Sequence, residues 1–99
     1  MKIDKTQNGE DLTVALDGRL DVTTAPKFDA ALGSLEGVTN LVIDMTKLEY
    51  ISSAGLRVLM GALKMLNKKG GHIEIVGVNK DLWSIFELTG VIDILNVKS

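Results

Sequence analysis

The feature that most limits the possible folds is a segment in the middle of the chain whose residues predict a buried strand. Residues 41–45 have the sequence LVIDM, a nearly continuous apolar run with β-branched side chains. Such a run is typical of a strand in a parallel sheet, where both faces of the sheet are covered. Parallel neighbours need long crossover connections, which are usually helices. We therefore expect an α/β fold in which strands alternate with helices.

Further strands are expected on both sides of this one. Residues 2–7 are almost all polar, which suits an edge strand, and residues 12–16 alternate between two faces. Asn8 and Gly9 lie between these segments and form a strong hairpin signal. Two segments downstream share the strand-like character: residues 72–78 and residues 91–97.

Three helices are expected among these strands, the second over residues 54–69. A side chain suited to the N-cap precedes each helix: Thr23 or Thr24, Ser52 or Ser53, and Asn79. A glycine stands where each helix should end: Gly37, Gly70 and Gly90. Apolar residues recur at helical spacing: Phe28, Leu32 and Leu35, then Leu56, Leu59, Leu63 and Leu66, then Leu82, Ile85 and Phe86. The expected order is β-β-α-β-α-β-α, in one domain over residues 1–99 with a mixed sheet of four to five strands.

The composition argues against several classes of protein. The chain contains no cysteine, which rules out disulfides, thiolate metal sites and a cysteine nucleophile. A net charge of −2 and only 4% aromatic residues argue against a nucleic-acid surface. No apolar run approaches the roughly 20 residues of a membrane span, and the first residues lack the apolar core of a signal peptide. We expect a soluble cytoplasmic protein with neither a nucleic-acid nor a membrane partner.

Templates for catalysis find little support in the sequence. His72 is the only histidine, which excludes sites with two histidine ligands, and we interpret it as an exposed residue at a strand end. Asp21 and Asp44 could form an acid–base pair, but each closes an apolar stretch, which favours a structural or surface role. Gly70 and Gly71 precede a strand, so the helix N-terminus of a phosphate-binding loop is missing. We expect no enzymatic activity, no cofactor and no metal.

The start of the second helix is the most informative segment, with Ser52 and Ser53 both at its N-terminus. One serine is enough to cap a helix, so the second hydroxyl is spare. A phosphoryl group on it would meet unpaired N–H groups and the positive end of the helix dipole, and it would add nearly two negative charges to the surface. Gly55 in the first turn would let another surface approach the backbone closely. These properties predict an interaction switch.

The second helix is apolar over more than its row of leucines. Val58, Ala62 and Met65 form a second row at helical spacing, and Met60 stands nearby. A small sheet could bury such a wide helix face. Alternatively, the row could be a contact surface for a partner, for which the adaptable Met side chains are suited.

Three segments carry a resemblance to a known family: GRLD at residues 18–21, LVID at residues 41–44 and ISSAGLRVL at residues 51–59. The chain resembles the STAS domain, in particular the free-standing bacterial anti-sigma factor antagonists, or anti-anti-sigma factors. The similarity covers nearly the whole chain, and the last segment resembles the phosphorylation loop of the family. The resemblance implies a STAS-type, SpoIIAA-like α/β fold.

The resemblance also implies a function, which is partner switching. In the family, the dephosphorylated antagonist binds an anti-sigma factor that is also a GHKL-type serine kinase, and a sigma factor is thereby released for transcription. The kinase uses ATP to phosphorylate one serine of the antagonist, which breaks the complex, and a PP2C-type phosphatase restores it. By position the acceptor is Ser53, with Ser52 as the alternative. Residues that match the docking surface of the family are Asp21, Thr23, Ser52, Ser53, Gly55, Arg57 and Val58.

Two positions depart from the pattern of the family. Many members have Asp directly before the acceptor and Ser or Thr directly after it, where this chain has Ser52 and Ala54. The first change removes a charge from the docking surface. An alternative function is that of the STAS accessory subunit of a bacterial lipid-transport ABC complex, and a small-ligand or nucleotide-binding domain is a third. We expect a monomer or a weak dimer.

Overall fold

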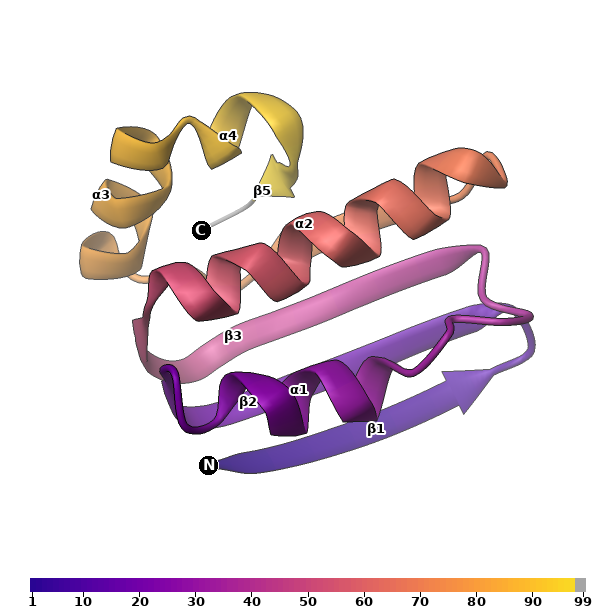
Figure 1. Cartoon of the computed structure of the whole chain (residues 1–99), viewed down its shortest axis with the longest axis horizontal. Helices are drawn as coiled ribbons and strands as arrows, with labels where there is room; N and C mark the ends of the chain where they lie inside the picture. Colours follow the sequence, from indigo (N-terminus) through magenta and orange to yellow (C-terminus); the bar gives the residue numbers. More distant parts are fainter. Residues whose placement is uncertain (98–99) are drawn as a thin grey trace.

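A mixed sheet of five strands organises the chain (Figure 1). The computed structural model describes residues 1–97, without the side chains of residues 93, 94 and 96. The strands lie in the sheet in chain order: β1 (Lys2–Asn8), β2 (Asp11–Leu20), β3 (Asn40–Ile51), β4 (His72–Val76) and β5 (Asn96–Val97). β1 forms the predicted antiparallel hairpin with β2, and each later strand is parallel to the one before it. The predictions of a mixed sheet and a polar edge strand are confirmed.

Four helices connect or follow these strands in the described residues: α1 (Ala25–Leu32), α2 (Ser53–Lys68), α3 (Lys80–Thr89) and α4 (Val91–Ile94). α1 and α2 lie side by side in front of the sheet, and α3 and α4 lie on the other side of α2 from α1 (Figure 1). The predicted element order is confirmed as far as α3. The segment 91–97, expected to be one strand, is divided into α4 and the short β5. Within residues 1–97, no helix has the length and apolar character needed to cross a membrane.

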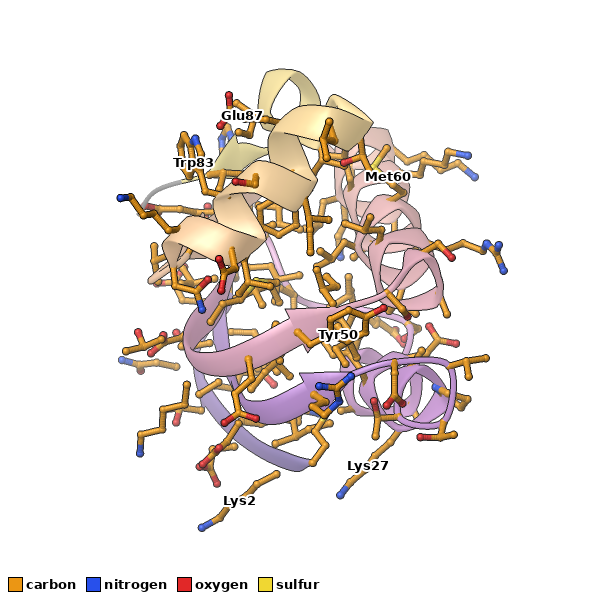
Figure 2. The ribbon with its side chains drawn as sticks, turned by 90° about the vertical axis from the view of Figure 1, so that its left-hand side faces the viewer. Lys2, Lys27, Tyr50, Met60, Trp83 and Glu87 are labelled. Atoms are coloured by element: carbon orange, nitrogen blue, oxygen red, sulfur yellow. The ribbon has the colours of Figure 1, made fainter. Side chains whose placement is uncertain are left out.

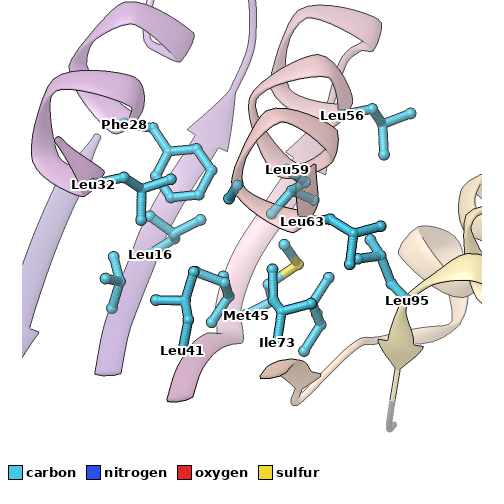
Figure 3. Close-up of a cluster of buried hydrophobic side chains, with 14 of the residues drawn as sticks. Leu16, Phe28, Leu32, Leu41, Met45, Leu56, Leu59, Leu63, Ile73 and Leu95 are labelled. Carbon is cyan, nitrogen blue, oxygen red and sulfur yellow. The ribbon is translucent and has the colours of Figure 1, made fainter. Parts of the chain in front are cut away.

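The hydrophobic core lies on one face of the sheet, beneath the helices (Figure 3). Buried side chains alternate along the three central strands: Leu12, Val14 and Leu16, then Leu41, Ile43 and Met45, then Ile73 and Ile75. Phe28 of α1, Leu59 of α2 and Phe86 of α3 are fully buried in the same cluster. Val42 and Asp44 point to the other face and are only partly buried. The expectation that both faces of β3 are covered is therefore wrong, because parallel neighbours on both edges do not require a second layer of helices.

β3 extends further than expected and leads directly into α2. The sequence predicts a strand over residues 41–45 and then a loop, yet β3 continues to Ile51, and Ser52 alone separates it from α2. The register between β2 and β3 shifts at two places, and each shift is a β-bulge or similar irregularity. The shifts change the spacing of buried residues, so that Leu48 and Ile51 are buried three positions apart. A two-residue period therefore does not detect this half of the strand.

α1 is shorter than expected. It ends at Leu32 and is followed by Gly33 at a φ of 61°, whereas the sequence predicts an end at Gly37. Leu35 was expected to continue the apolar stripe of the helix. It lies instead in the following loop, with a φ of 56°, and its side chain is buried. Its carbonyl accepts a hydrogen bond from the ammonium group of Lys69 at the end of α2. The predicted burial of Leu35 is confirmed and its predicted helical conformation is wrong, because a loop can return an apolar side chain to the same core.

The predicted cap of α3 is confirmed. The side-chain oxygen of Asn79 accepts a hydrogen bond from the backbone N–H of Leu82 at 2.9 Å. The side-chain nitrogen of Asn79 donates to the carbonyl of Leu48 at 3.2 Å, which ties the start of α3 to β3. β4 ends at Val76, two residues earlier than expected, and Gly77 follows it at a φ of 73°.

Gly55 brings the first turn of α2 against the ends of β2 and β3. A Cβ atom at this position would lie 2.7 Å from Cγ of Leu20 and 3.0 Å from Cγ1 of Ile51. Leu20 is fully buried, so its side chain has no free space into which it can turn. The sequence predicts that Gly55 lets another surface approach the backbone, and that surface is the sheet of the same molecule. This packing explains the glycine without a partner, and a role of Gly55 in partner binding stays a prediction.

Replacing Gly55 by Ala should lower the free energy of unfolding by about 1–2 kcal/mol, because overpacking outweighs the gain in helix propensity. Gly61 of the same helix is the matched control, since it is exposed and an added Cβ would meet no atom within 4 Å. Gly61→Ala should raise the free energy of unfolding by about 0.5–1 kcal/mol. Urea denaturation followed by circular dichroism measures both changes. Shifts of the same sign in the two variants would contradict the packing role of Gly55.

Candidate functional site

The two serines and Asp21 meet at the edge of the sheet where β2 and β3 end. Leu20 and Ile51, the last residues of these strands, are partners in the parallel register, and the backbone N–H of Ser52 donates to the carbonyl of Leu20 at 2.8 Å. The turn that starts at Asp21 therefore lies next to the start of α2, which contains Ser53. Figure 2 looks onto this edge, with Tyr50 near its centre.

The two serine hydroxyls have different surroundings. Ser52 is the N-cap of α2, and its half-buried side chain accepts a hydrogen bond from the backbone N–H of Gly55 at 3.4 Å. Its carbonyl accepts the first helical hydrogen bond, from the N–H of Leu56 at 3.0 Å. Ser53 is exposed, and within residues 1–97 its hydroxyl makes no hydrogen bond. The structure therefore leaves one serine hydroxyl accessible while the other caps the helix.

Asp21 is held in a tight turn by the two threonines that follow it. Its Oδ1 atom accepts hydrogen bonds from the hydroxyl of Thr23 at 2.6 Å, from the N–H of Thr23 at 3.0 Å and from the N–H of Thr24 at 3.2 Å. The Thr23 hydroxyl, and then the two backbone N–H groups, lower the pKa of Asp21 against the opposing effect of desolvation. Asp21 is thus an ionised carboxylate in a fixed position.

Thr24 occupies the N-cap position of α1, as predicted, but its hydroxyl does not cap the helix. The hydroxyl accepts a hydrogen bond from the N–H of Asp21 at 2.8 Å and donates to the carbonyl of Arg19 at 2.8 Å. The turn between β2 and α1 is therefore tied to the end of the strand by a side chain. The guanidinium of Arg19 in turn lies over the ring of Tyr50, 4.5 Å from its centre.

The structure does not bring Asp21 and Asp44 together. Asp44 lies within β3 opposite Ala15, several residues before Asp21 along β2. Hydrogen bonds from the side chain and backbone of Thr46 lower the pKa of Asp44, whereas a general acid needs a raised pKa. The acid–base hypothesis is therefore wrong: the Asp21 carboxylate holds the turn before α1, and the Asp44 carboxylate accepts hydrogen bonds from Thr46 within β3. His72 is exposed at the start of β4, as predicted, at the opposite end of the sheet from Ser53.

A shallow groove of about 630 Å³ separates α1 from α2 and begins next to Ser53. Its lining is mainly apolar and includes Val22, Pro26, Ala54, Arg57, Val58 and Met65. The second apolar row of α2 divides here, because Ala62 is buried in the core whereas Val58 and Met65 are half-buried in the groove. The interpretation that the fold buries this row holds for Ala62, whereas a partner contact at Val58 and Met65 stays a prediction.

Most of the site residues predicted from the sequence lie around this edge. Asp21, Thr23, Ser52 and Ser53 surround the ends of β2 and β3, and Arg57 and Val58 follow in the groove, whereas Gly55 lies beneath the surface. Sequence reasoning missed Val22, whose side chain is 72% exposed at the mouth of the groove. An apolar residue in a turn between a strand and a helix was the signal that could have identified it.

Thr23→Ala should raise the pKa of Asp21 toward that of a free aspartate, because the hydroxyl is the largest cause that lowers it. A carboxylate whose pKa is lower in the folded state than in the unfolded state stabilises the fold at a pH above the unfolded-state pKa. This contribution is lost as the pH falls through the folded-state pKa. The variant should therefore lose less of its stability in acid than the parent protein. Carbon NMR titration of the aspartate carboxyls measures the change, with Asp44 as the internal control. An unchanged Asp21 titration would contradict this prediction.

Comparisons with known proteins agree with the fold and the sequence motifs. The family model of the STAS domain matches residues 2–99. The chain is 32% identical over 97 residues to an anti-sigma-B factor antagonist of Listeria monocytogenes, covering 96% of this chain and 85% of that one. It is also 32% identical over 100 residues to an anti-sigma-B factor antagonist of Bacillus subtilis, covering 100% of this chain and 92% of that one.

Solved structures share the fold at lower sequence identity. An anti-sigma factor antagonist from Mycobacterium paratuberculosis has a TM-score of 0.86 at 24% identity, over 98% of this chain and 84% of that one. The Bacillus cell fate determinant SpoIIAA in its phosphorylated form has a TM-score of 0.78 at 16% identity, over 99% and 92%. The STAS domain of a SulP transporter from Vibrio cholerae has a TM-score of 0.71 at 21% identity, over 95% and 77%. The predicted SpoIIAA-like fold is confirmed, and this chain belongs to the STAS domain family, alongside the bacterial anti-sigma factor antagonists.

Proposed function

We propose that this protein is an anti-sigma factor antagonist that acts by partner switching. Its unphosphorylated form binds an anti-sigma factor that is also a GHKL-type serine kinase, and the bound kinase releases a sigma factor. The names of the relatives support the class of function. The observation that carries the mechanism is the division between the two serines, of which Ser52 caps α2 and Ser53 keeps an exposed hydroxyl.

Ser53 is the acceptor in this proposal. The kinase transfers the γ-phosphoryl group of ATP to the Ser53 hydroxyl, which has no hydrogen bond within residues 1–97 that would have to be broken. The phosphate adds about −1.5 to −2 charges to the surface. The N-terminus of α2 tolerates them because its unpaired N–H groups and dipole favour an anion. The modification therefore changes the surface without changing the fold, and a PP2C-type phosphatase reverses it.

The docking surface in this proposal combines a charged rim with the apolar groove. Asp21 and Thr23 form a fixed anionic turn near the start of α2. Arg57 and Val58 follow Ser53 along α2 and line the groove between α1 and α2. A new dianion on Ser53 opposes a partner that is complementary to the unmodified surface, because its charge must be desolvated when the partner binds.

Incubation with the anti-sigma factor kinase and ATP should add one phosphoryl group to the parent protein and none to Ser53→Ala, as read by intact mass. Ser52→Ala is the matched control. It should lose about 1 kcal/mol of stability with its cap but still accept the phosphoryl group. Absence of modification in the parent protein, or equal modification of Ser53→Ala, would count against the assignment.

Ser53→Asp should weaken binding to the kinase while leaving the melting temperature nearly unchanged, since the Ser53 side chain makes no hydrogen bond within residues 1–97. Isothermal titration with the kinase and a thermal melt measure the two effects. A large fall in melting temperature would mean that Ser53 is mainly structural. Co-purification of the parent protein with a membrane ATPase, and not with a soluble kinase, would instead indicate the lipid-transport alternative.

A further inference from the structure

Arg57 follows Ser53 by one helical turn on α2. Residues four apart on a helix lie on the same face, with their Cβ atoms about 5–6 Å apart. Both side chains are exposed, and Arg57 makes no ion pair or hydrogen bond within residues 1–97. Its guanidinium is thus a free cation next to the one serine hydroxyl of this edge that is also free.

We propose that phosphorylation of Ser53 draws the guanidinium of Arg57 into an intramolecular ion pair with the phosphate, and so withdraws it from the groove. This inference rests on the proposed function for the event of phosphorylation. It adds a second effect to the switch, because one modification introduces an anion and also removes a cation from the docking surface.

The order of the two residues along the helix favours the pair. An anion placed four residues before a cation is the more stable order of such a pair on a helix, and a phosphate on Ser53 would also lie at the positive end of the helix dipole. Arginine suits this role because its planar fork can donate two parallel hydrogen bonds to a phosphate. Phosphoserine is therefore a better partner for Arg57 than the neutral hydroxyl now present.

Other cations near the groove are less suited. Lys64 lies on the same helix, but at about 1.5 Å of rise per residue it is roughly 16 Å along the axis from Ser53. The ammonium of Lys27 on α1 donates to the carbonyl of Met1 at 2.9 Å, which holds it toward β1. The guanidinium of Arg19, at the end of β2, lies over the Tyr50 ring, 4.5 Å from its centre. Of the cations on α1 and α2, Arg57 is thus the one that lies one helical turn from Ser53.

The position of Arg57 also explains why the pair would affect docking. Its side chain lines the groove, in which Asp29 of α1 is a second charged residue. In the unphosphorylated protein the guanidinium is available to a carboxylate of the partner. The N–H groups of the Arg57 guanidinium cannot donate the same paired hydrogen bonds to that carboxylate and to a phosphate on Ser53 at once. The two contacts therefore compete.

The test uses the full chain with phosphoserine inserted at position 53 during translation, so that no kinase is required. Phosphorus NMR titration gives the second pKa of the phosphate, which is about 6 for an unperturbed phosphoserine. Arg57→Gln should raise this pKa by about 0.2–0.4 units, the size expected of an exposed ion pair between residues four apart on a helix. Arg57→Lys should give a smaller rise, and Lys64→Gln is the matched control that removes the same charge out of reach.

A second measurement follows Arg57 directly. Its Nε–H signal in a nitrogen–proton NMR spectrum should shift and exchange more slowly with water when Ser53 carries the phosphate. Equal titrations of the parent and Arg57→Gln, or an equal shift in Lys64→Gln, would overturn the inference. Because the phosphate is installed without the kinase, such a result leaves the proposed function standing, and a failure of the kinase assay leaves this inference standing.

Discussion

The parallel pairing of β2 with β3 is the interaction on which the rest of the structure depends. The pairing continues to the last residues of both strands, Leu20 and Ile51, and extends one step further to the N–H of Ser52. It therefore fixes the Asp21 turn and the start of α2 relative to each other, although about thirty residues of chain separate them. Gly55 completes the arrangement, because the missing side chain lets the helix rest directly on those strand ends.

At this site, the residues that stabilise the structure are different from the residue whose hydroxyl is free to react. Capping is the task of the half-buried Ser52, and the turn before α1 is held by threonine hydroxyls and backbone groups. Neither network includes the hydroxyl of Ser53, which is free within residues 1–97. A group added to that hydroxyl would thus alter charge and contacts at the surface while the supporting hydrogen bonds stay in place.

Much of the fold was predictable from the sequence, because its signals are local. The hairpin, the central strand, the leucine stripe of α2 and the Asn79 cap all follow from residue periodicity and capping chemistry. The second half of β3 and the true end of α1 were not predictable, since register shifts and a loop leucine with positive φ depend on tertiary packing. At the site, the two serines could be located but not told apart, and the role of Gly55 could not be known without its neighbours.

The register shifts in β3 have a consequence for how such a site diversifies. They lie between Asp44 and Tyr50, ahead of Ser52, the residue that caps α2. Each extra residue in a bulge moves the side chains that follow it to the opposite face of the strand. The number of bulges therefore decides which side chain between β3 and α2 faces outward. An insertion or deletion in this short stretch would therefore change which serine hydroxyl faces the solvent. The core residues before the stretch and the helix after it would keep their own sequences.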